Sequence, residues 1–199
     1  MDGGFVAEGP RIGPNAILQL IPVLDAAIGP QGRAALFARS GVLVPPADAG
    51  MMPQDQVIRL HHTVAMALPD RFAEIANSAG AATGDYILAN RIPTPAQTLI
   101  RILPRPLGAR LLAAAIAKHA WTFAGSGRFA VVGHRPLTFR IETNPLAVGM
   151  AGTPSCHWHS AVFQRLFQAL VWPAVIVTET TCCACGDAAC TFKIAPAQG

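Results

Sequence analysis

The first 155 residues of this 199-residue chain contain no cysteine, so all five cysteines lie between residue 156 and the end. Thiol chemistry is therefore confined to one part of the molecule. The chain also lacks a basic segment followed by an apolar one at its start, so we expect no secretory signal peptide and a cytoplasmic location. In a reducing cytoplasm, clustered cysteines bind metal more often than they form disulfides.

Charged side chains are scarce as well: they make up 13% of the residues, against 52% for hydrophobic residues. The 15 Lys and Arg residues exceed the 11 Asp and Glu residues, but they are scattered and form no basic block. Nucleic-acid-binding proteins usually cluster their cations among aromatic residues, so we expect no nucleic-acid partner. The high apolar fraction predicts either an apolar cavity or a surface that meets a membrane or an apolar partner.

Two further absences limit the function. No apolar run is long and uninterrupted enough to span a membrane: residues 107–117 contain Arg110, and residues 161–177 contain Arg165 and Pro173. No Gly-x-Gly-x-x-Gly motif follows a predicted strand, and no flavin signature stands out. The sequence therefore offers no visible site for a redox cofactor.

Apolar periodicity predicts a helical first part followed mainly by strands. We expect helices over 15–28, 33–40, 54–68, 69–91, 96–103, 107–123 and 157–171, and strands over 128–133, 136–143, 174–181 and 189–194. Residues 1–13 are expected to be a loose segment, and residues 14–199 a single domain. Helices followed by a small antiparallel sheet indicate an α+β fold.

Three details of these helices carry their own expectations. Asn15 is a good N-cap residue for the first helix. Residues 107–123 are almost entirely apolar, which predicts a central helix. The small residues Ala76, Gly80 and Gly84 form a strip that allows close approach of another helix or of a flat ligand, and helix packing is the favoured interpretation.

The cysteines form a dense cluster, with four of them in the nine positions 182–190 and Glu179 just upstream. If the two flanking strands pair, Cys182 and Cys190 face each other at the end of a hairpin. Glu179 reaches the same place, and Cys156 stands at the start of the preceding helix. Three sulfurs and a carboxylate suit a tetrahedral zinc ion.

Other interpretations of the cluster stay open. Cys185 could replace one of the four ligands or form a redox pair with Cys182, and the ligand count also allows an iron–sulfur cluster. No standard ferredoxin spacing or thioredoxin-like context supports these alternatives. His157 and His159 lie next to Cys156 in the sequence, and we expect them to support the metal ligands from behind.

The spacing of Cys156, Glu179, Cys182, Gly186 and Cys190 resembles the signature of the vinyl-reductase (4-vinyl reductase) domain family. In phenol-responsive sensors of that family the equivalent cysteine, glutamate and two cysteines bind zinc, so the resemblance implies those roles here. It also implies a fold like that of the Bet3-type subunits of vesicle-tethering complexes, and pairing of two chains into a homodimer.

Residues 11–16 and 84–93 resemble the bacteriochlorophyll-biosynthesis branch of that family. The branch implies a divinyl protochlorophyllide-type tetrapyrrole as ligand, the reduction of its 8-vinyl group as the associated step, other bacteriochlorophyll-biosynthesis enzymes as partners, and a location peripheral to the photosynthetic membrane. Because no redox motif is visible, a carrier or assisting factor is favoured over a reductase that uses an external reductant. A sensor of small aromatic molecules is the third alternative.

A tetrapyrrole ligand raises the question of what binds its magnesium ion. The chain has six histidines. We favour His119, because it follows an apolar run and precedes Trp121, whose ring could stack on a macrocycle. His134, in the turn of a predicted hairpin, is the second candidate.

Overall fold

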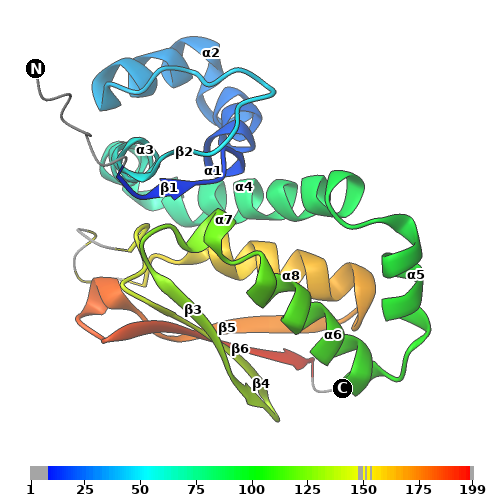
Figure 1. Cartoon of the computed structure of the whole chain (residues 1–199). Coiled ribbons are helices and arrows are strands. Elements are labelled where there is room, and N and C mark those ends of the chain that lie inside the picture. The colour runs from blue at the N-terminus through cyan, green and yellow to red at the C-terminus, as the bar shows by residue number, and fades with distance from the viewer. Residues whose placement is uncertain (1–8, 148–149, 151, 153, 198–199) are drawn as a thin grey trace, which may run out of the picture.

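The structure is a computed structural model that describes residues 9–147, 150, 152 and 154–197 (Figure 1). Its elements, in chain order, are β1 (Arg11–Ile12), α1 (Asn15–Leu18), α2 (Leu20–Ser40), β2 (Met52–Pro53), α3 (Gln54–Ala67), α4 (Pro69–Asn90), α5 (Thr94–Ile102), α6 (Arg105–Lys118), α7 (Trp121–Ala124), β3 (Arg128–His134), β4 (Leu137–Glu142), α8 (His157–Leu170), β5 (Val175–Thr181), the short 3-10 helix η1 (Cys183–Cys185) and β6 (Ala189–Pro196). The predicted α+β class is confirmed.

The main sheet has four antiparallel strands in the order β3-β4-β6-β5, so both predicted hairpins are present. Side chains alternate between the two faces of a strand, and in β4 and β6 one set is buried. This inward set consists of Leu137, Phe139, Ile141, Cys190, Phe192 and Ile194. Helix α8 lies beside this sheet, and α4 packs on the other side of α8 (Figure 1).

Phe163 is the centre of an aromatic cluster between α8 and the sheet. Its ring centroid lies 5.8 Å from that of Phe123, 5.1 Å from Phe139 and 5.4 Å from Phe192, with steep interplanar angles. These edge-to-face contacts join α7, β4 and β6 to one helical side chain. The cluster fills the space where an apolar cavity could have formed.

The glycine strip of α4 packs against α8, as the helix-packing interpretation predicts. A Cβ atom at Gly80 would lie 2.4 Å from the carbonyl oxygen of Trp158 and 2.8 Å from the Cβ atom of Ala161. A Cβ atom at Gly84 would lie 2.7 Å from that of Arg165. Only glycine at these two positions lets the helices approach this closely.

Replacing Gly80 with alanine is therefore expected to lower the free energy of unfolding by about 2 kcal/mol. The added methyl group meets a backbone carbonyl that can move only if α8 moves, and this cost exceeds the gain in helix propensity of about 1 kcal/mol. Urea unfolding followed by circular dichroism measures the change. Ser78→Ala, at an exposed position of the same helix, is the control and should change stability by less than about 0.5 kcal/mol. Equal stability of the two variants would contradict the packing argument.

Two expectations about the N-terminal part are wrong. Pro14, not Asn15, is the N-cap residue of α1, and the Asn15 Oδ1 atom is buried without a hydrogen-bond partner among the described residues. Residues 11 and 12 are not loose, because they form β1, which pairs with β2, and the Ile12 side chain is fully buried. One anchored isoleucine is enough to order this end, which glycine content alone does not reveal. Residues 1–8 lie outside the described residues, and the extent of a single domain stays a prediction.

The long apolar helix expected over 107–123 is also different. It divides into α6 and α7 at His119 and Ala120, and α6 is peripheral rather than central. Leu107 and Leu111 are 49% and 40% exposed, while the opposite side of α6 packs against α5, α8 and β3. A helix that is apolar all round gives no pattern from which its buried face can be read. No helix among the described residues has the length and apolar character needed to cross a membrane.

Candidate metal centre

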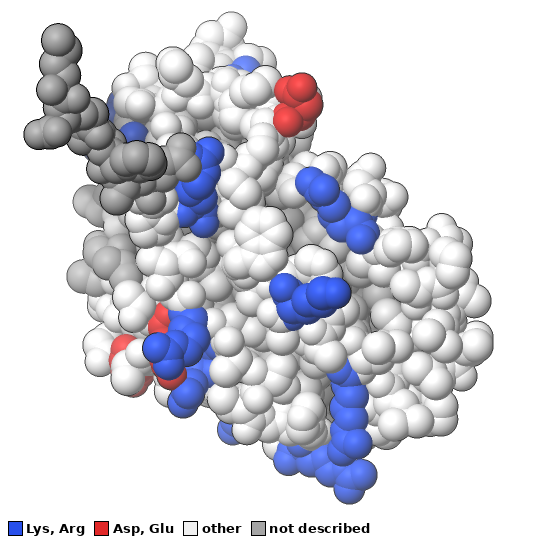
Figure 2. Space-filling view, viewed as in Figure 1, with Lys and Arg blue, Asp and Glu red and all other residues white. Residues whose placement is uncertain are grey.

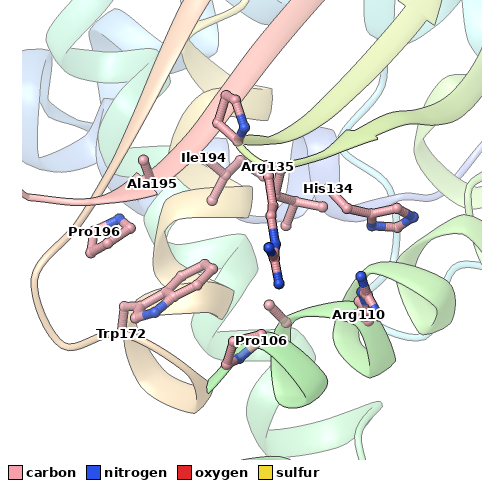
Figure 3. A pocket seen from close by; sticks show the side chains of 11 residues that line it. Pro106, Arg110, His134, Arg135, Trp172, Ile194, Ala195 and Pro196 are labelled. Carbon is pink, nitrogen blue, oxygen red and sulfur yellow. The ribbon is translucent and has the colours of Figure 1, made fainter. Parts of the chain in front are cut away.

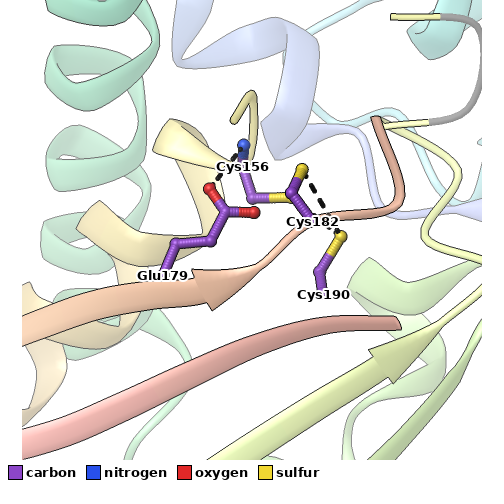
Figure 4. A group of neighbouring side chains, drawn as sticks. All are labelled: Cys156, Glu179, Cys182 and Cys190. Atoms are coloured by element: carbon purple, nitrogen blue, oxygen red, sulfur yellow. Dashed lines mark hydrogen bonds between the residues drawn. The ribbon is translucent and has the colours of Figure 1, made fainter. Parts of the chain in front are cut away.

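The structure brings together the four side chains that the sequence predicts as metal ligands (Figure 4). Cys156 is the N-cap residue of α8, Glu179 points from β5, Cys182 follows the end of β5, and Cys190 lies in β6. One ligand atom from each residue lies within 4.8 Å of all the others. The three cysteines are at most 2% exposed, so the group is closed to bulk water.

The turn between β5 and β6 explains why the sequence folds in this way. Gly186 adopts a positive φ of 91°, which ends η1 and reverses the chain. The Cys182 backbone N–H donates to the Asp187 carboxylate at 2.8 Å, and the Cys185 N–H donates to the Cys182 carbonyl at 2.9 Å. The turn therefore holds Cys182 and Cys190 beside each other before any ligand is considered.

The sulfur separations fit a shared metal ion. The Cys156 Sγ lies 3.1 Å from the Cys190 Sγ and 3.8 Å from the Cys182 Sγ, and the last two are 4.0 Å apart. Tetrahedral zinc with zinc–sulfur bonds of about 2.3 Å requires sulfur atoms about 3.8 Å apart. Two separations already match, and the third requires an outward shift of well under 1 Å.

Glu179 supplies the fourth position. Its Oε2 atom accepts a hydrogen bond from the Cys156 backbone N–H at 3.3 Å. Its Oε1 atom is buried and has no hydrogen-bond partner among the described residues. A buried carboxylate oxygen without a partner costs free energy, and a cation among the sulfurs would remove that cost. This donor set therefore fits zinc.

The acid–base state of the cluster agrees with a missing positive charge. Hydrogen bonds among the three thiols raise the pKa of Cys156 far above its ordinary value, lower the pKa of Cys182 to about 4 and lower that of Cys190 as well. Burial raises the pKa of Glu179 to about 8. Four acidic groups this close cannot all ionise by themselves, and a divalent cation would replace the protons that they otherwise keep.

Sequence reasoning missed Asn144. Its fully buried side chain donates from Nδ2 to the Cys156 Sγ at 3.2 Å, and its Oδ1 accepts from the Leu146 backbone N–H at 3.2 Å. The Cys183 backbone N–H donates to the Cys190 Sγ at 3.3 Å. Such donors stabilise thiolates and orient metal ligands. In the sequence, Asn144 precedes a proline and indicates only a loop. Cys185, the suggested substitute ligand, is exposed on η1 and outside the group of four.

The two neighbouring histidines do not support the ligands. The His159 side chain is 1% exposed and points to the core, where its Nε2 lies 3.5 Å from the Phe123 carbonyl oxygen. Burial lowers the pKa of His159 to about 4, so its ring is neutral near pH 7. The His157 ring packs against Phe72 of α4. The expectation that both rings contact the metal ligands is wrong, because α8 turns His159 away from Cys156.

The candidate pigment-binding residues lie at two separate places. His119 is the exposed C-cap residue of α6, its Nδ1 lies 2.8 Å from the Ala115 carbonyl oxygen, and Trp121 beside it is 59% exposed. His134 ends β3 and lies in a pocket with Pro106 and Arg110 from the first turns of α6. Since the 14 residues of α6 span about 21 Å, the structure does not bring the two histidines together.

Comparisons with known proteins place this arrangement in context. Residues 137–196, which contain all four candidate ligands, match the 4-vinyl reductase domain, and this agrees with the vinyl-reductase-type domain expected from the sequence. A protein of Cereibacter sphaeroides named bacteriochlorophyll synthase 23 kDa chain is 58% identical over 97% of this chain and 94% of its own length. A protein of the same name from Rhodobacter capsulatus is 54% identical over 95% of this chain and 89% of its own length.

Solved structures with a similar fold are H-NOX proteins. The Fe(II) unliganded H-NOX protein from K. algicida has a TM-score of 0.64 at 10% identity and covers 94% of this chain and 98% of its own. An H-NOX protein from S. oneidensis in the Fe(II)NO ligation state has a TM-score of 0.56 at 10% identity, with 94% and 100% covered. At this identity the likeness concerns the fold alone. The expected likeness to Bet3-type subunits stays a prediction.

Proposed function

The chain belongs to the family of the bacteriochlorophyll synthase 23 kDa chains, and we propose from this membership that it acts in bacteriochlorophyll biosynthesis. The observation that carries the proposal is the near-complete alignment with two relatives of that name. Both relatives are named as one chain of a synthase. This supports a role beside other bacteriochlorophyll-biosynthesis enzymes.

Within that pathway, the chain binds a divinyl protochlorophyllide-type tetrapyrrole and assists the step that reduces its 8-vinyl group. Two surface pockets of about 190 Å³ and 280 Å³ are smaller than the roughly 300–1,000 Å³ of typical sites that enclose a small molecule. A pigment held against the surface can pass to another enzyme more easily than one that is enclosed. This supports the role of carrier or assisting factor over that of sole catalyst.

The cluster of Cys156, Glu179, Cys182 and Cys190 binds zinc in a structural role. Zinc supplies no redox chemistry, and a site with four protein ligands leaves no open position for a substrate. The buried unpartnered oxygen of Glu179 and the sulfur separations support this assignment. The protein's own residues tie the start of α8 to the β5–β6 hairpin through the bound ion. Homodimer formation and a location peripheral to the photosynthetic membrane complete the proposal.

The test is to incubate the purified protein with divinyl protochlorophyllide and NADPH, and to measure pigment binding by absorbance and product by chromatography. We expect saturable binding and no 8-ethyl product in excess of the protein. Ethyl product in large excess would instead establish the alternative function, a reductase that uses an external reductant. Binding of phenols without binding of the pigment would establish a sensor of small aromatic molecules.

The same assay locates the magnesium ligand. His119→Ala and His134→Ala change the two candidate imidazoles, and both side chains are exposed, so neither change should affect folding. The variant that loses the shift in the pigment spectrum identifies the pigment-binding end of α6. Trp121 belongs to the His119 end, and its replacement by leucine should weaken binding only if that end holds the pigment.

A further inference from the structure

A pocket of about 190 Å³ lies where four parts of the fold meet (Figure 3). Pro106 and Arg110 come from the start of α6, and His134 and Arg135 from the turn between β3 and β4. The other side is formed by Trp172, which follows α8, and by the end of β6. No Asp or Glu lines this pocket.

Two of the lining residues are cations without a counter-ion. The guanidinium groups of Arg110 and Arg135 form no ion pair and no hydrogen bond with the described residues, and in Figure 3 the Arg135 side chain reaches across the pocket toward α6. Two guanidinium groups that approach one another repel, because guanidinium stays charged at any physiological pH. An anion between them would convert this repulsion into attraction.

The surrounding sequence adds to the positive charge. Residues 86–141 contain eight Lys and Arg residues and no Asp or Glu. The next carboxylate along the chain, Glu142, is already paired with Arg128 and Arg140. Figure 2 shows basic side chains across the face formed by α6 and the β3–β4 hairpin, with acidic atoms only near the top and the lower left. This face therefore attracts anions over more than one contact.

The opposite wall is apolar and flat. The Trp172 ring is stacked on that of Phe167, with centroids 5.9 Å apart and an interplanar angle of 17°. Ile194, 1% exposed, and Pro196 continue this wall. Because Trp172 is fixed by this stacking, it offers a rigid aromatic surface to the edge of a planar ligand.

We infer that this pocket binds the carboxylate arm of a flat, apolar molecule. Arg110 and Arg135 hold the carboxylate, since guanidinium donates two parallel hydrogen bonds to it. Trp172 and Pro106 contact the adjoining ring edge, and the rest of the ring lies outside the pocket. On the proposed function, the arm is the propionate side chain of the tetrapyrrole, which assigns the His134 end of α6 to the pigment.

The first test uses 1-pyrenebutyrate, a fluorescent flat ring with a carboxylate arm, and 1-pyrenebutanol, the same molecule with a neutral arm. The unaltered protein should bind the acid saturably and the alcohol at least about tenfold more weakly. The double variant Arg110→Gln/Arg135→Gln should lose at least about tenfold in affinity for the acid only. Both arginines are exposed, so the melting temperature should stay the same.

The control is Arg39→Gln/Lys118→Gln, which removes the same charge from exposed positions in α2 and at the end of α6. It should bind the acid as the unaltered protein does. Absence of saturable binding, equal affinities for acid and alcohol, or equal losses in the two double variants would each overturn the inference.

The second test repeats the titration with divinyl protochlorophyllide and with its propionate methyl ester. We expect the ester, and the double variant with the free acid, to bind at least about tenfold more weakly. If the protein binds both pigments equally well, the inference about the carboxylate fails while the proposed function stands. If it binds pyrenebutyrate through the two arginines but neither pigment, the pocket stands and the proposed function fails.

Discussion

Replacing Cys190 with serine is expected to release the bound zinc and to lower the free energy of unfolding by more than about 3 kcal/mol. Cys190 is fully buried, and its Sγ lies within 4.0 Å of both other sulfurs. A serine hydroxyl is a poor zinc ligand, and without the ion the acidic groups that remain must keep protons or repel each other. Elemental analysis should find about one zinc per unaltered chain and far less in the variant.

The matched control is Cys185→Ser. Cys185 belongs to the same turn but is exposed and outside the group of four ligands, so this variant should keep its zinc and its stability. Chemical unfolding with and without a chelator separates metal loss from other effects, because the chelator should destabilise only proteins that hold zinc. If Cys190→Ser keeps both zinc and stability, the ligand assignment is wrong.

The second large effect is expected at Phe163, where replacement by alanine should cost about 3–5 kcal/mol in stability. Phe163 is 1% exposed and meets the aromatic rings of α7, β4 and β6 at centroid distances of 5.1 to 5.8 Å. Alanine leaves a cavity that these rings cannot fill, since each is held by its own element. Urea unfolding measures the loss.

Leu99→Ala serves as the control for that experiment. Leu99 is also a large apolar residue on a helix, but it is 46% exposed, so its removal should cost less than about 0.5 kcal/mol. A small cost at Phe163, comparable to that at Leu99, would show that the space between α8 and the sheet is not filled as described.

Local sequence signals predicted much of the fold. Pro69 marks the first turn of α4, Gly41 ends α2 with a positive φ of 64°, and the strands on either side of the cysteine turn pair as expected. These features depend on residues close together in the chain. Glu179 and Cys182 were predictable for the same reason, since one hairpin places both.

What sequence could not predict depends on contacts between distant segments. Nothing near Asn144 indicates that its amide donates to a sulfur 12 residues away. The buried face of α6 is hidden because nearly every side of that helix is apolar. The pocket of Arg110, Arg135 and Trp172 unites residues from three separate elements, and each residue alone resembles an ordinary surface or core residue.

Helix α8 joins the two ends of the molecule. Its first turn is held by Cys156 in the metal cluster, and the residue pair that follows its last turn places Trp172 in the wall of the pocket. Between these points the glycine strip of α4 fixes the helix sideways. Because a packed helix is stiff along its axis, it acts as a strut, and a shift of Cys156 toward or away from the proposed zinc ion is carried to Trp172. Occupancy of the metal cluster and the width of the pocket are therefore mechanically linked.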